Sequence, residues 1–311
     1  MWQQRRSRYP RRLTLCGCRL YARLHCGSHA RRIEAVSLTI TPLSNALGVA
    51  VEGVDLSKPV PPGDLARIKQ ALIDHLVMVV RDQSLDPVQL LTAVRLFGET
   101  MEQHLSDTLM QDHPEIAVLD SRKMPPDKQG RVIPFGARVW HTDHTNHERP
   151  PKYTALYAVK LPTEGGDTSF ANMHTAYTEL PADERKSLEE LETVNKIEDF
   201  AYISEEARAK FSTLPRHPLI RTHPETGKKA IYVHPGKLER IVGREAEESN
   251  EFVGALLDRV IGEANTYRHK WRAGDLLFCD NRAVMHRAHR DYDMAEGRVM
   301  HRIILRGDRP V

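Results

Sequence analysis

Residues 274–286 of this 311-residue chain read GDLLFCDNRAVMH. The apolar run LLFC predicts a buried strand, Asp280 and Asn281 predict a polar turn, and AVMH predicts a second strand that carries His286. The segment GRVMHRIILRG at 297–307 predicts a further strand soon afterwards. These closely spaced strands indicate that the C-terminal portion is built mainly from β-structure.

The remaining sequence predicts more strands and several helices. Strand patterns occur at 37–43 and 48–56, which should form a hairpin, and at 76–80, 116–120, 139–146, 152–159, 167–172 and twice within 217–233. Helical patterns occur at 61–76, 87–98, 173–193 and 247–261, with Asp86 as the N-cap of the second. This mixture predicts an α+β fold, mainly β: a double-stranded β-helix (jelly roll) core decorated by helices. We expect residues 37–311 to form a single domain.

The leader, residues 1–36, differs in composition from the rest of the chain. Its first 35 residues contain nine arginines, no lysine, one acid and three of the four cysteines. Such a segment is typical of an organelle transit peptide. Its Cys and His residues could alternatively bind zinc, although their spacing is unusually tight; they are Cys16, Cys18, His25, Cys26 and His29. We favour a third interpretation, a disordered or spurious leader.

Charge and hydropathy narrow the classes of partner. Without the first 35 residues the chain has 36 basic and 41 acidic residues, a net charge of −5, so we expect no nucleic acid partner. No segment approaches the roughly 18 apolar residues of a membrane-spanning helix, so no membrane is expected either. Cys279 alone in the body provides no disulfide framework. We therefore expect a cytoplasmic location, with organelle targeting by the leader as the alternative.

Four His-x-acid pairs occur, about twice the number that chance gives in a chain with 16 His and 42 acidic residues. They are His113/Glu115, His141/Asp143, His223/Glu225 and His289/Asp291. The pairs at 113 and 223 have proline in the middle, which predicts solvated turns at strand boundaries. His141 and Asp143 lie in a predicted strand, where residues two apart share a face. This pair is therefore the candidate for metal binding.

His286 is the candidate for the second histidine of a two-histidine, one-carboxylate site. Such a triad occupies one face of Fe(II) and leaves the opposite positions open. A lone histidine is more often structural or exposed, so Arg298 and Arg302 carry the argument. As strand residues four apart they can both point inward, and a guanidinium can hold the far carboxylate of a metal-chelating 2-oxo acid. The alternative is that each forms a surface salt bridge.

Four motifs, in the same order and with similar gaps, resemble the TauD/TfdA family of taurine and 2,4-dichlorophenoxyacetate dioxygenases. They are WHTDHT, LPTEGGDTSF, GDLLFCDNRAVMHRA and GRVMHRIILRGDRP. The resemblance covers residues 38–310 and excludes the leader. It implies a jelly-roll fold that uses Fe(2+), with 2-oxoglutarate and O2 as co-substrates. It also implies that His141, Asp143 and His286 are the iron ligands, and that Thr168 and Arg298 grip the distal carboxylate of 2-oxoglutarate.

The resemblance further implies a site for the substrate. Arg302 matches the position that meets the sulfonate in the taurine enzyme, and His104 is similar to a substrate-contacting histidine, with the alignment shifted by one residue. His144 and Asn146 replace residues that are apolar or aromatic there, which predicts a more polar pocket and argues against taurine itself. The expected reaction is hydroxylation of a small organic anion, such as a sulfonate, alkyl sulfate or aryloxyalkanoate, with release of succinate and CO2. Family members are often homo-oligomers, so a homo-oligomer is expected.

Two other functions are compatible with the sequence. A non-catalytic jelly-roll protein could bind metal or ligand through the same residues without turnover. A metal-dependent hydrolase could use His286, His289 and Asp291, although their spacing fits a helix only in part and CDNRAVM favours a strand. The long polar loop at 121–134 is a candidate lid over the site.

Overall fold

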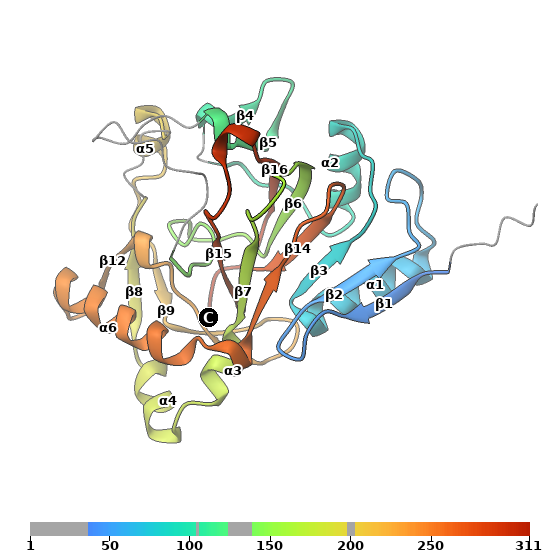
Figure 1. Cartoon of the computed structure of the whole chain (residues 1–311). Helices are drawn as coiled ribbons and strands as arrows, with labels where there is room; N and C mark the ends of the chain where they lie inside the picture. Colours follow the sequence, from blue (N-terminus) through green and yellow to red (C-terminus); the bar gives the residue numbers. More distant parts are fainter. Residues whose placement is uncertain (1–36, 104–105, 124–138, 198–202) are drawn as a thin grey trace, which may run out of the picture. The chain divides into compact units, whose positions relative to one another are not determined.

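The structure, a computed structural model, describes residues 37–103, 106–123, 139–197 and 203–311. The Arg-rich leader with its Cys and His cluster, His104 and most of the candidate lid lie outside the described residues. The described part is a mixed α and β structure dominated by strands, as the sequence predicts (Figure 1). No helix within these ranges is long and apolar enough to cross a bilayer.

A large sheet runs through the described residues in the order β1-β2-β3-β14-β6-β16-β5-β4. The first two strands form the expected antiparallel hairpin, and the C-terminal strand β16 inserts between β5 and β6. The sheet therefore joins segments from both ends of the described chain. Its strands are β1 (Thr39–Pro42), β2 (Val49–Glu52), β3 (Val77–Val80), β4 (Leu109–Met110), β5 (His113–Asp120), β6 (Tyr153–Lys160), β14 (Leu276–Asp280) and β16 (Val299–Leu305).

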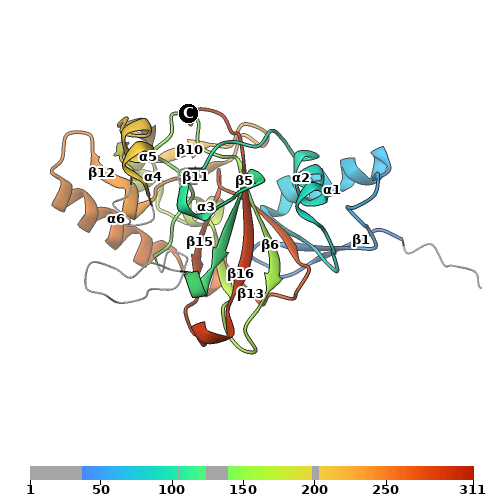
Figure 2. The same ribbon diagram turned by 90° about the horizontal axis from the view of Figure 1, so that it is seen from above.

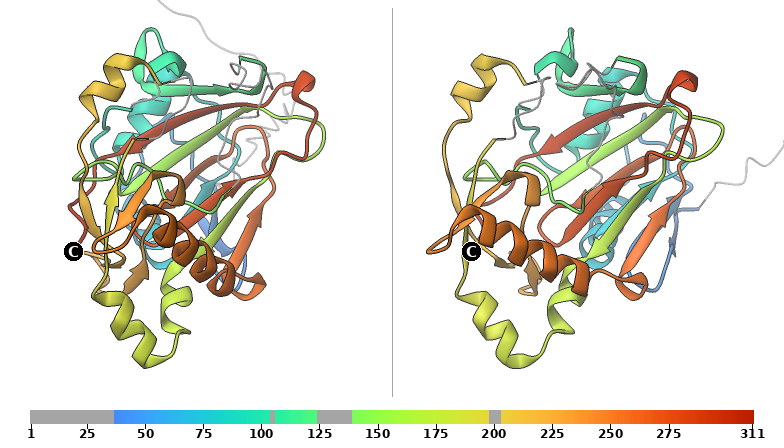
Figure 3. Two further views of the ribbon diagram at one scale, coloured as in Figure 1. Left: turned by 90° about the vertical axis from the view of Figure 1, so that its left-hand side faces the viewer. Right: turned by 60° about the vertical axis from the view of Figure 1, so that its left-hand side comes forward.

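A second, antiparallel sheet has the order β13-β7-β15, with β13 at Thr266–His269, β7 at Thr168–Asn172 and β15 at Val284–Ala288. Strands β14 and β15 are consecutive in the chain but belong to different sheets, so the polar turn at 281–283 carries the chain from the large sheet to the second one (Figure 3). The predicted strand, turn and strand at 274–286 are thus confirmed. This crossing places His286 on an edge strand of the second sheet.

Smaller strands and the helices complete the fold. The hairpin β10 (Ile220–Thr222) and β11 (Lys229–Ile231) encloses the predicted ETGKK turn, and a third sheet has the order β12-β8-β9. Its members are β8 (Glu192–Asn195), β9 (Arg216–Pro218) and β12 (Leu238–Ile241). The helices are α1 (Pro62–His75), α2 (Pro87–Arg95), α3 (Met173–Thr178), α4 (Ala182–Glu189), α5 (Glu205–Lys210) and α6 (Ala246–Val260). Short 3-10 turns occur at Ser106–Thr108, Ser121–Lys123, Pro235–Lys237, Glu263–Asn265 and Met294–Glu296.

Helix α2 begins where the sequence predicts. Asp86 accepts a hydrogen bond from the backbone N–H of Gln89 at 2.8 Å, and the Gln89 side chain accepts from the Asp86 backbone at 3.0 Å. This reciprocal cap satisfies two donors that the first helical turn leaves free. Helices α1 and α2 lie on one side of the described domain, and α4 and α6 lie on the other (Figures 1 and 2).

The core shows the two-residue period expected of a central strand. On β14, Leu276 and Phe278 belong to the cluster that packs against α1 and α2, whereas Leu277 and Cys279 belong to the cluster that includes Phe170 of β7. These four side chains of β14 are fully buried. The large sheet is therefore covered on both faces, by helices on one and by the second sheet on the other. This packing holds β14 in place, and the turn after it leads to His286 on β15.

Three local predictions are wrong in whole or in part. Residues 139–146 do not form a strand, apart from an isolated antiparallel bridge between His141 and His286. The polar residues TDHTN favour turns, and His144 adopts a left-handed backbone with φ 52°. His113 lies at a strand boundary, as predicted, but begins strand β5 instead of forming a turn. His223 directly follows β10 and is followed by a turn at 224–226, as predicted, but it is buried with its Nε2 3.1 Å from Oδ2 of Asp280, so the prediction that it is solvated is wrong.

Candidate metal centre

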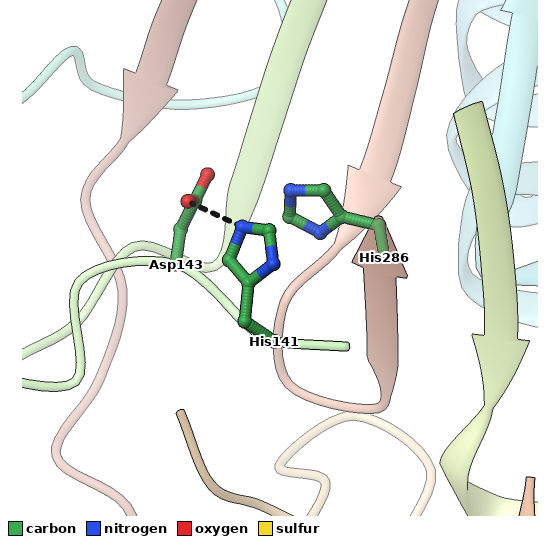
Figure 4. A group of neighbouring side chains, drawn as sticks. All are labelled: His141, Asp143 and His286. Carbon is green, nitrogen blue, oxygen red and sulfur yellow. Dashed lines mark ion pairs between the residues drawn. The ribbon is translucent and has the colours of Figure 1, made fainter. Parts of the chain in front are cut away.

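His141, Asp143 and His286 converge on one point (Figure 4). One potential ligand atom from each lies within 4.8 Å of the other two, and all three side chains are buried. The backbones of the two histidines are paired: the His141 N–H donates to the His286 carbonyl at 3.1 Å, and the His286 N–H donates back at 2.8 Å. The ring centroids are 4.2 Å apart. Within the described ranges no other group of three His, Cys, Asp or Glu residues could hold a metal ion.

The protonation states suit a divalent cation. Burial and the neighbouring His141 lower the pKa of His286 to about 3, so its ring is neutral at neutral pH. Burial acts to raise the pKa of Asp143, but the nearby Arg302 guanidinium and the hydrogen bond from Thr154 act against it, and that pKa lies well below its usual range. The Nδ1 of His141 lies 3.0 Å from the Val139 carbonyl, to which it donates, so Nε2 is the nitrogen that could bind a metal ion. Two imidazoles and one carboxylate are the donor set that suits Fe(II) with open positions.

The residues of the hydrolase alternative do not assemble. His289 lies 2.7 Å from the Ser169 hydroxyl through Nε2. Asp291 forms an ion pair with Arg268 at 2.6 Å and accepts from the Gly166 backbone. Neither joins the group that contains His286, so the geometry does not support a hydrolytic site built from these three residues.

Thr168 and Arg298 meet around Trp271, a residue that the sequence did not single out. The indole N–H of Trp271 donates to the Thr168 hydroxyl at 3.1 Å, and the Arg298 guanidinium lies 5.8 Å from the indole ring centroid. Arg298 Nε donates to the Gly166 carbonyl at 2.9 Å, which leaves its terminal nitrogens for an anion. Both Thr168 and Arg298 are buried. A hydroxyl and a guanidinium held in this way could bind a carboxylate.

Arg302 lies on β16 and reaches the metal candidates. Its Nη1 is 3.7 Å from Oδ1 of Asp143, its Nε donates to Oε1 of Gln103 at 3.0 Å, and its Nη2 donates to Nε2 of His144 at 3.1 Å. Because Arg can only donate, the His144 Nε2 must accept, and its ring is neutral in this arrangement. Sequence reasoning misses Gln103, which directly precedes His104, and the one-residue shift in the alignment is the signal that could have found it.

The loop at 144–147 forms a polar wall beside Arg302. His144 is buried, and its ring centroid lies 5.5 Å from that of His147. Asn146 is also buried, and its side-chain amide makes no hydrogen bond to any described residue. The structure thus brings His144 onto Arg302 and places Asn146 in the same loop, without a hydrogen bond from its amide to the described residues of the triad or to either arginine. A buried unpartnered amide is available to a polar ligand.

Comparisons with known proteins agree with this geometry. Residues 39–304 match the family model described as taurine catabolism dioxygenase TauD, TfdA family. An alpha-ketoglutarate-dependent sulfate ester dioxygenase of Pseudomonas putida is 32% identical over 291 residues, which cover 89% of this chain and 92% of that protein. An alpha-ketoglutarate-dependent 2,4-dichlorophenoxyacetate dioxygenase of Burkholderia sp. is 29% identical, covering 83% and 91%. The crystal structure of a taurine dioxygenase from Burkholderia xenovorans superposes with a TM-score of 0.73 at 32% identity, covering 88% and 91%. The chain belongs to the TauD/TfdA family.

Proposed function

We propose that residues 37–311 form one dioxygenase domain with a double-stranded β-helix core, and that it hydroxylates a small organic anion with release of succinate and CO2. As a TauD/TfdA family member the chain is an oxidoreductase of the 2-oxoglutarate-dependent dioxygenase type, with Fe(2+) as cofactor and 2-oxoglutarate and O2 as co-substrates. The packing of the large sheet on β13-β7-β15 supports the proposed core. His141, Asp143 and His286 would hold the iron.

The observation that carries the proposed substrate class is the position of Arg302. Its Nη1 lies 3.7 Å from Oδ1 of Asp143, so an acidic group bound to this guanidinium would hold its neighbouring carbon atoms beside the metal. Gln103 and His144 fix the plane of the guanidinium. Two relatives are named for sulfate esters and for 2,4-dichlorophenoxyacetate, which are both anions.

Each group in the site has a separate task. Iron(II) and 2-oxoglutarate, when bound, supply the oxidising chemistry of the reaction with O2. Arg298 and Thr168 would bind the distal carboxylate of 2-oxoglutarate, because both are buried and joined through Trp271. Arg302 would bind the substrate's acidic group. The burial of the triad limits access of water, which protects the oxidation from side reactions.

A substrate panel tests this proposal. The protein would be purified anaerobically with Fe(II), and O2 uptake and succinate would be measured with 2-oxoglutarate and alkyl sulfates, sulfonates or aryloxyalkanoates. Each anion would be paired with its uncharged analogue, such as the alcohol that lacks the sulfate. We expect one anion class to stimulate succinate formation and its neutral analogue to leave the basal rate unchanged. Equal stimulation by the neutral analogue would contradict the role of Arg302.

The same assay separates the non-catalytic alternative. A binding protein that keeps the triad would take up Fe(II) and 2-oxoglutarate but form no succinate with any member of the panel. The intact triad and the presence of both arginines favour the enzyme.

A further inference from the structure

The two oxygens of the Asp143 carboxylate have different surroundings. Oδ1 lies 3.9 Å from Nε2 of His141, the contact drawn as a dashed line in Figure 4, and 3.7 Å from Nη1 of Arg302. Oδ2 accepts a hydrogen bond of 2.6 Å from the hydroxyl of Thr154. One oxygen therefore faces the other candidate ligands, while the other oxygen is held by a neutral donor that no sequence motif singles out.

Asn281 determines the direction in which the Thr154 hydroxyl points. Its Nδ2 lies 2.9 Å from Thr154 Oγ1, and because an amide nitrogen can only donate, the hydroxyl oxygen accepts there. The hydroxyl proton is then left for Asp143. The orientation of the amide is also fixed, because Asn281 Oδ1 accepts from the backbone N–H of Asp143 at 3.3 Å. The flipped amide would place two donors against each other.

Thr154 and Asn281 both belong to or directly follow strands of the large sheet. Thr154 lies on β6 between β14 and β16, and its side chain is 1% exposed. Asn281 directly follows β14 and accepts, through its carbonyl, a hydrogen bond of 2.6 Å from the hydroxyl of Thr142. Asp143 itself lies in the irregular loop at 139–147. Hydrogen bonds from Thr154 and to Asn281 therefore hold Asp143, which lies in a loop, in a fixed position relative to the central strands β6 and β14.

We propose that Thr154 is a positioning residue that leaves Oδ1 of Asp143 for the metal, and that Asn281 sets the direction of its hydroxyl. Because Oδ2 already accepts the hydrogen bond from Thr154, binding of the ion through both oxygens of Asp143 is disfavoured. A carboxylate that binds through one oxygen keeps a coordination position for the co-substrates. This inference builds on the proposed function and adds two residues that do not themselves touch the reacting atoms.

Variants at Thr154 test the inference through metal binding alone. Thr154→Val removes the hydroxyl and keeps the size and branching of the side chain, whereas Thr154→Ser keeps the hydroxyl. Thr193→Val is the matched control. Thr193 is also a buried threonine on a strand, β8, and its hydroxyl donates to the His217 carbonyl at 3.2 Å. The full chain would be titrated anaerobically with Fe(II) without 2-oxoglutarate. The visible spectrum of the Co(II)-loaded protein would report the coordination number.

We expect Thr154→Val to weaken Fe(II) binding about 10- to 100-fold and to change the Co(II) spectrum. Thr154→Ser should stay within about threefold of the wild type, and Thr193→Val should not differ from it. Wild-type affinity and an unchanged spectrum in Thr154→Val would overturn the inference, while the proposed function would stand as long as His141→Ala loses Fe(II). Failure of the wild type to bind Fe(II) would overturn both. If Thr154→Val does not fold, Thr154→Ala compared with Thr154→Ser gives the same decision.

Discussion

Two buried clusters among the described residues, one around Asp280 and one around Asp143, are built from the same residue types but differ in how fully their polar atoms are paired. In the Asp280 cluster, Oδ1 accepts from Nε of Arg282 at 2.8 Å, and Oδ2 accepts from its Nη2 at 2.6 Å and lies 3.1 Å from Nε2 of His223. Arg282 also donates to the hydroxyl of Tyr153 at 3.0 Å and to Glu225 at 2.5 Å. Every strong acceptor and donor in this cluster has a partner within the protein.

The metal cluster, by which we mean His141, Asp143 and His286 as the proposed iron ligands, is different because part of its bonding capacity is unused. Asp143 has one oxygen bound to Thr154, and its other oxygen has only the distant contacts to His141 and Arg302. Asp280 forms a close ion pair with Arg282 at 2.6 Å. Beside Asp143, in contrast, the ring of His286 is kept neutral by burial and provides no such positive charge. Residue type alone does not separate a structural cluster from a binding site. What separates them is whether ligand atoms, such as Oδ1 of Asp143, remain without a close partner in the protein.

The largest expected effect is at the metal cluster. His141→Ala should lower 2-oxoglutarate-dependent succinate formation more than about 100-fold, because even partners outside the ligand set are worth 10- to 100-fold. Succinate would be quantified under saturating Fe(II). The control is His289→Ala, which removes a residue of the hydrolase alternative and leaves the triad intact. Strong loss of turnover in His289→Ala with normal turnover in His141→Ala would reverse the assignment.

The Asp280 cluster should respond in stability instead of catalysis. Asp280→Asn removes the buried carboxylate that binds Arg282 through both oxygens and leaves only the partly exposed Glu225 opposite that guanidinium, and we expect the free energy of unfolding to fall by about 3 kcal/mol. Chemical denaturation would measure it. Glu225→Gln is the matched control, because the Glu225 side chain is 40% exposed and should cost less than about 1 kcal/mol. If the folded fraction of Asp280→Asn lost Fe(II) binding, the separation of the two clusters would not hold.

The two arginines of the site should separate in kinetics. Arg302→Gln should raise the KM for the anionic substrate about 10- to 100-fold and leave the KM for the co-substrate 2-oxoglutarate nearly unchanged, because a charged hydrogen bond is worth about 1.5 to 3 kcal/mol. Arg298→Gln should show the opposite pattern. Each variant is the control for the other in initial-rate measurements. A common increase in both KM values for both variants would mean that the arginines share one ligand.

The smallest effect concerns His217, a buried histidine that bonds to carbonyls and not to a carboxylate. Its Nε2 lies 2.9 Å from the carbonyls of Thr145 and His147, and burial lowers its pKa to about 4. The unfolded chain therefore binds more protons than the folded one between about pH 4 and pH 6.5. As the pH is lowered through that window, this group reduces stability by up to about 1.4 kcal/mol per pH unit.

His217→Gln keeps an N–H donor and removes the titration. Its free energy of unfolding, measured by denaturation at about pH 7 and about pH 5.5, should fall less steeply on acidification than that of the wild type. An unchanged slope would show that folding does not lower the pKa of His217.

The sequence predicts elements with a regular period well and contacts between distant segments poorly. The strand, turn and strand at 274–286 and the helix capped by Asp86 are both local patterns, and both are confirmed. The turn at His223 is confirmed, but the prediction that this residue is solvated is wrong, because its partner Asp280 lies 57 residues away. The prediction of a strand at 139–146 is wrong because alternation alone does not reveal a left-handed residue such as His144.

The candidate site follows the same division. The triad can be selected because His141 and Asp143 share one motif and His286 has a second one, and the structure brings them together. Gln103 and Trp271 cannot, because each forms a hydrogen bond to a residue more than 100 positions away in the sequence. Thr154 lies only 11 residues from Asp143, but it is on a strand and Asp143 is in a loop. No local pattern encodes such a bond.

The backbone bridge between His141 and His286 has a consequence for motion. Because each residue donates to the carbonyl of the other, the two imidazoles are connected by a ring of hydrogen bonds between their own backbones. When the loop at 139–147 moves, the two imidazoles should move together. The distance between the two rings then stays constant, while the distance from the rings to Arg298 and Arg302 changes. The two amide protons should exchange with solvent at matching rates, as a single opening unit.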